Sequence, residues 1–126
     1  MQKQRPVYLD VPKLAMNLPI PGIISIMHRI SGVALFVALP FVLYLLAGTL
    51  SQEEQFASYQ ALVAHPLVKI ALLGLLWGYM HHFCAGIRFL LLDAHKGLEL
   101  PTARMTAKLV VVISLALTVI LGAWLW

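Results

Sequence analysis

This 126-residue sequence has little charge and a single cysteine, Cys84. Charged residues make up 11% of the chain and hydrophobic residues 61%, whereas soluble domains are about 25% charged and about 45–50% apolar. One thiol excludes an internal disulfide and a cysteine-held iron–sulfur centre. A glycine-rich nucleotide-binding loop is also absent. We therefore expect one integral membrane domain, residues 1–126, with little soluble surface.

Three long apolar runs occupy most of the chain, at residues 20–50, 66–92 and 109–126. A transmembrane helix needs about 20 mostly apolar residues. The runs predict an all-α integral membrane protein with three transmembrane helices, at about residues 21–50, 66–93 and 104–126. No Asp or Glu lies within any run. This argues against an ion-coupled transporter, because such proteins commonly carry a carboxylate there.

The basic residues predict the orientation in the membrane. They are scattered at the borders of the runs, so the net charge of +4 does not indicate a patch for nucleic acid. The connection between the first two runs carries Glu53 and Glu54 instead. By the positive-inside rule, the N-terminus and the second connection are cytoplasmic, and the C-terminus is periplasmic. The basic residues concerned are Lys3, Arg5, Lys13, Arg88, Lys96, Arg104 and Lys108.

The first run contains an embedded charged pair, His28-Arg29, near its start. A charge within a membrane segment is costly and is by default a functional candidate. Ser25 and Arg29 are four residues apart and share a helix face. Both can donate hydrogen bonds to an oxygen that gains negative charge, as a quinone oxygen does on reduction. Two alternatives stay open: Arg29 extends to lipid headgroups, and Ser25 bonds its own helix backbone.

The second run contains His81 and His82 among small residues. Glycines let another helix or a flat group approach closely, and a histidine in such a groove is a candidate axial ligand for haem iron. The spacing does not choose between the two histidines. Arg88 lies about 9 Å further along the helix than His82, within reach of a haem propionate. A second axial ligand would come from another subunit. Simple helix packing is the alternative.

Taken together and in this order, the motifs resemble the cytochrome b-type membrane-anchor subunit of bacterial succinate dehydrogenase, respiratory complex II. The three-helix plan of that family spans the whole chain. The matching strings are Arg5-Pro6-x-x-Leu9-Asp10, Ser25-Ile26-x-His28-Arg29-x-Ser31-Gly32, and His82-x-x-x-Gly86-Ile87-Arg88 followed by Asp93.

The resemblance implies a role for each site residue. Ser25 and Arg29 would border the ubiquinone site, His82 would be the axial ligand of haem b, and His28 would lie near the haem propionates. A second small membrane-anchor subunit would supply the other axial histidine. A flavoprotein subunit would oxidise succinate, and an iron–sulfur subunit would pass electrons to ubiquinone at the bacterial cytoplasmic membrane.

One residue departs from the family pattern. Phe89 follows Gly-Ile-Arg, where members often carry histidine, so a contact at the haem edge is in doubt but axial ligation is not. The resemblance leaves a fumarate reductase anchor open as an alternative. The rival from another class is a non-redox structural or transport-related membrane protein, whose histidines and arginines serve packing and topology.

Overall fold

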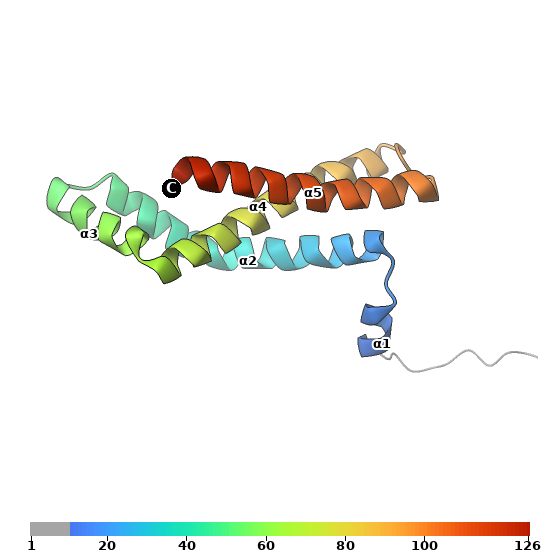
Figure 1. Ribbon diagram of the computed structural model, residues 1–126, viewed down its shortest axis with the longest axis horizontal. Coiled ribbons are helices and arrows are strands. Elements are labelled where there is room, and N and C mark those ends of the chain that lie inside the picture. Colours follow the sequence, from blue (N-terminus) through green and yellow to red (C-terminus); the bar gives the residue numbers. More distant parts are fainter. Residues whose placement is uncertain (1–10) are drawn as a thin grey trace, which may run out of the picture.

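The computed structural model describes residues 11–126, which form five helices and no strand. Arg5 and Asp10, which belong to the first matching string, lie outside the described residues. In Figure 1 the long helices run along the molecule, with α3 at one end and α1 projecting near the other. The helices are α1 (Val11–Met16), α2 (Ile20–Thr49), α3 (Glu53–Ala64), α4 (Pro66–Asp93) and α5 (Leu100–Leu125).

The three long helices are apolar enough to cross a membrane. Over their most apolar windows, α2, α4 and α5 have mean hydropathies of 2.4, 1.4 and 2.3. The shortest, α5, has 26 residues and is about 39 Å long, which exceeds the ~30 Å hydrocarbon core of a bilayer. Within the described residues, the predicted all-α fold with three spanning helices is confirmed.

Each long helix has a proline in its first turn: Pro21, Pro66 and Pro101. Proline fits there because its fixed φ suits a helix and its missing N–H would have no intrahelical partner. Pro101 also explains why α5 begins at Leu100, four residues before the expected start. The chain turns into α5 through two residues with positive φ, His95 at 58° and Gly97 at 72°.

The core of the described residues is small and lies where the long helices meet. Its buried apolar residues are Ile24, Ala85, Ala107 and Val110. Ala85 of α4 and Ala107 of α5 have no exposed surface, as expected where small residues let two membrane helices approach closely. Most large apolar side chains face outward instead. An exposed apolar surface of this kind is typical of a face that contacts a membrane or another protein.

Candidate functional site

Helices α2 and α4 cross at two stacked histidines. The rings of His28 and His82 have centroids 4.1 Å apart and planes 9° apart. Each ring lies over a glycine of the opposite helix. A Cβ atom on Gly32 would come 3.0 Å from His82 Cε1, and one on Gly86 would come 3.7 Å from His28 Nε2. A side chain at position 32 would therefore need the His82 ring to shift by a few tenths of an ångström.

The same histidine–glycine spacing occurs in both helices that form this crossing. His28 precedes Gly32 by four residues, and His82 precedes Gly86 by four. Because α2 and α4 run in opposite directions (Figure 1), each histidine reaches the glycine of the other helix. The two His-x-x-x-Gly spacings are therefore the sequence signal for this pairing, and they indicate it only when the two helices are compared with each other.

The His82 ring is held through its Nδ1 atom. Nδ1 lies 3.1 Å from the backbone oxygen of His28 and 3.2 Å from Ser31 Oγ. A carbonyl oxygen only accepts hydrogen bonds, so we infer that Nδ1 carries the proton and donates. Nε2 then presents its lone pair. Among the described residues, Nε2 has no hydrogen-bond partner and is not enclosed.

His81 lies in a different environment. Its side chain is 1% exposed, and both ring nitrogens are enclosed without a hydrogen-bond partner among the described residues. Trp77, whose ring centroid is 5.9 Å away, also has an enclosed and unpartnered Nε1. His81 lines a small cavity between α2 and α4 together with Trp77, but both of its ring nitrogens are buried. The structure thus separates two neighbouring histidines that the sequence spacing could not.

The glycines of α4 do not act as one stripe. Where a Cβ would stand on Gly74 or Gly78, nothing lies within 4 Å. These two glycines face a cavity of about 200 Å³ between α2 and α4. Only Gly86 approaches another helix of this chain closely at the crossing, through His28. Within residues 11–126, the packing alternative for the glycines therefore holds at Gly86 but not at Gly74 or Gly78.

Ser25 and Arg29 lie on α2 beside the crossing. Ser25 is half-buried and Arg29 is exposed. Neither side chain forms a hydrogen bond or ion pair with any residue that the structure describes. Ser25 thus does not bond its own helix backbone, as the alternative interpretation of this serine required. Both polar groups are available to a molecule outside this chain.

Arg88 is buried between α4 and α5. Its Nε donates to Thr106 Oγ1 and its Nη2 donates to the backbone oxygen of Ala103, both at 3.1 Å. These bonds use two of the five N–H donors of a guanidinium. Arg88 also lies 5.5 Å from the Phe89 ring centroid, and Phe89 packs edge-on against His28 at 5.1 Å. Sequence reasoning missed the anchoring to α5, because nothing in the spacing links Arg88 to Thr106.

Comparison with known proteins assigns this chain to a family. A family model described as "Succinate dehydrogenase/Fumarate reductase transmembrane subunit" matches residues 1–121. The chain belongs to this family. The resemblance drawn above from the histidine, arginine and serine motifs is thereby confirmed. The family also agrees with a multi-pass membrane protein, and it does not favour a non-redox structural or transport-related protein.

Three similar proteins each carry the name succinate dehydrogenase cytochrome b556 subunit. The anchor subunit described here is 37% identical to that of Coxiella burnetii over 127 residues, with 100% of both chains covered. It is 34% identical to that of Rickettsia prowazekii over 111 residues, covering 87% of this chain and 86% of the relative. It is 33% identical to that of Paracoccus denitrificans over 104 residues, covering 82% and 80%.

Proposed function

We propose that this chain anchors a succinate:ubiquinone oxidoreductase in the membrane, supplies one axial ligand to a haem b, and forms part of the ubiquinone site. The relatives named as cytochrome b556 subunits of succinate dehydrogenase favour succinate oxidation over fumarate reduction and favour a b-type haem. The observation that carries the proposal is the His82 ring, whose Nδ1 is bonded to α2 while Nε2 stays available.

The residues at the crossing fit a haem. A histidine that ligates haem iron binds through one ring nitrogen and forms a hydrogen bond through the other, and the contacts of His82 fit this arrangement. The ring nitrogens of His81 are enclosed, which argues against His81 as the ligand. Arg88 retains N–H donors that would serve a haem propionate. For His28, which is stacked on His82, the propionate role is the one that the family resemblance implies. When bound, haem b supplies one-electron redox chemistry.

A second small anchor subunit supplies the other axial histidine under this proposal. Haem iron takes two axial ligands at most, and His82 would supply one of them. The exposed apolar side chains on all three long helices offer surface for such a subunit and for lipid. The haem would then be shared between the two chains.

The quinone role belongs to Ser25 and Arg29. Arg29 is exposed and pairs with no acidic residue in the described chain, so its charge can stabilise negative charge developing on a quinone oxygen. Ser25, one turn earlier, can donate a second hydrogen bond. Electrons would arrive from an iron–sulfur subunit docked on the cytoplasmic side, after a flavoprotein subunit oxidises succinate.

Isolation of the complex tests the proposed function. With an affinity tag on this chain, we expect detergent-solubilised membranes to yield an iron–sulfur subunit, a flavoprotein and a second small membrane subunit. The reduced-minus-oxidised absorption spectrum should contain a b-type band. An assembled complex without that band would refute the haem assignment. Recovery of this chain without any redox subunit would refute the anchor function.

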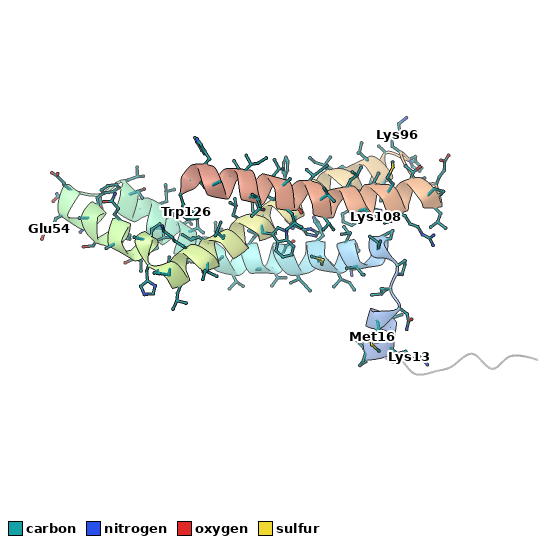
Figure 2. All side chains as sticks on the ribbon, in the orientation of Figure 1. Lys13, Met16, Glu54, Lys96, Lys108 and Trp126 are labelled. Carbon is teal, nitrogen blue, oxygen red and sulfur yellow. The ribbon has the colours of Figure 1, made fainter. Side chains whose placement is uncertain are left out.

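We also propose that the chain lies in the bacterial cytoplasmic membrane with its N-terminus inside. Figure 2 shows Glu54 at one end of the molecule and Lys13, Lys96 and Lys108 toward the other, the charge asymmetry that the positive-inside rule uses. Trp126 shares a cavity with residues of α3, so the C-terminus lies at the acidic end.

Cysteine labelling tests this orientation. In a Cys84→Ser background, a membrane-impermeant maleimide should label Glu54→Cys in intact cells. Lys96→Cys should be labelled only after the membrane is permeabilised. Labelling of Lys96→Cys in sealed cells, with Glu54→Cys protected, would invert the proposed topology.

A further inference from the structure

We propose that Ser31 is a positioning residue for the haem ligand His82, and that its hydroxyl lowers the midpoint potential of the haem. This inference rests on the proposed function, since it takes His82 as an axial ligand. It adds a residue of α2 that acts on the iron through another side chain, without contacting the iron itself.

Ser31 is 8% exposed and forms two hydrogen bonds at the crossing. Its Oγ donates to the backbone oxygen of His28 at 2.9 Å, one turn earlier in α2. With the hydroxyl proton committed there, a lone pair of Oγ is available to His82 Nδ1, 3.2 Å away. The Nδ1–H of His82 is therefore shared between the His28 carbonyl oxygen and the Ser31 hydroxyl.

The surroundings leave the His82 ring little freedom. The ring packs closely against Gly32, since a Cβ atom added to Gly32 would lie 3.0 Å from His82 Cε1. The His28 ring covers one face of the His82 ring. These contacts restrict the ring position, and the two acceptors fix which nitrogen carries the proton. The carbonyl acceptor belongs to the backbone and survives any substitution. The Ser31 hydroxyl is the acceptor that mutagenesis can remove.

A hydrogen-bond acceptor for the N–H of the non-ligating ring nitrogen changes the electronic properties of the histidine. It makes a metal-ligating histidine more basic and fixes its tautomer. A more basic axial ligand stabilises the oxidised iron more than the reduced iron. Loss of the Ser31 hydroxyl should therefore raise the haem midpoint potential, while the His28 carbonyl keeps the ligand in place.

Ser114 of α5 provides a matched control. It is also buried, with 0% exposed, and it donates to the backbone oxygen of Val111 three residues earlier at 3.0 Å. Ser31 and Ser114 thus share the same local backbone bond. They differ in that Ser31 also contacts His82 on another helix.

The test is a potentiometric titration of haem b in the purified complex. Ser31→Ala should raise the midpoint potential of the haem by up to about 59 mV. This shift corresponds to a tenfold change in the equilibrium constant of a one-electron reduction. Ser31→Thr keeps the hydroxyl and should stay at the wild-type value. Ser31→Cys, a weaker acceptor, should lie between, and Ser114→Ala should change nothing. Near-infrared magnetic circular dichroism should report bis-histidine ligation throughout.

Two results would overturn the inference: an unchanged potential in Ser31→Ala, or an equal shift in Ser114→Ala. If the complex with Ser31→Ala fails to assemble, the Ser31→Cys and Ser31→Thr variants test the inference. Identical haem midpoint potentials in these two variants would overturn the inference. Failure of the proposed function is distinguishable, because a His82 variant would then retain the haem. A haem that depends on His82 but ignores Ser31 would contradict this inference alone.

Discussion

Replacing His82 by Leu is expected to remove the b-type haem band from the complex, whereas His81→Leu is expected to leave it intact. His82 offers Nε2 to an iron while Nδ1 is bonded to α2. Leu cannot ligate, and the haem would retain a single axial ligand from the partner subunit. The measurement is the reduced-minus-oxidised spectrum and the haem content of the purified, assembled complex.

His81→Leu is the matched control because the two histidines are adjacent but differ in environment. Both nitrogens of His81 are buried without partners in the described chain, and an unpaired buried polar group costs about 1–3 kcal/mol. An apolar residue of similar size should therefore assemble at least as well as the wild type. Haem loss in His81→Leu with retention in His82→Leu would reverse the assignment.

Replacing Arg29 by Leu is expected to lower succinate-driven ubiquinone reduction by about 10²-fold, the usual effect of removing one donor to a developing oxyanion. Reduction of a dye that accepts electrons before the quinone site should be largely preserved. Ser25→Ala removes a neutral hydrogen bond of about 1 kcal/mol and should cost roughly fivefold. Both assays are made on the assembled, haem-containing complex.

Two controls separate a quinone role from a general effect of charge. Arg29→Lys keeps the charge but loses the planar fork of donors, so its activity should lie between wild type and Leu. Arg104→Gln alters another exposed arginine, on α5, and should leave both assays unchanged. A parallel loss of quinone and dye reduction in Arg29→Leu would refute the pocket role. No change in either would mean that Arg29 extends to lipid headgroups.

The three spanning helices could be predicted from sequence because each depends on local composition. Runs of apolar residues and a proline in each first turn define α2, α4 and α5 without reference to the rest of the chain. The apolar run alone predicts a start for α5 four residues after the observed one, because the run begins well after Pro101 in the first turn. Pro101 was the better guide to the start of this helix than hydropathy was.

The choice between His81 and His82 could not be made from spacing. Adjacent helix residues point about 100° apart, and the periodicity of α4 does not say which direction faces α2. The contacts that favour His82 join it to Ser31 and to His28, 51 and 54 residues away along the chain. The resemblance to a family predicts His82 as the ligand, and these long-range contacts support that prediction.

Arg88 shows a second limit of sequence reasoning. Its distance from His82 along the helix predicted reach toward a haem propionate, but its guanidinium is anchored on α5 through Thr106 and Ala103. A long side chain can extend toward a haem propionate or toward α5, and the rise along the helix alone does not predict which of the two it contacts. Its propionate role stays a prediction, supported by the donors that the two bonds leave unused.

A cryo-electron microscopy structure of the intact complex tests the central claim most directly. We predict continuous density between His82 Nε2 and the haem iron, with Nδ1 facing the His28 carbonyl and Ser31, and the second axial ligand from another subunit. An iron bound by His81 or His28, or by no residue of this chain, would contradict the account.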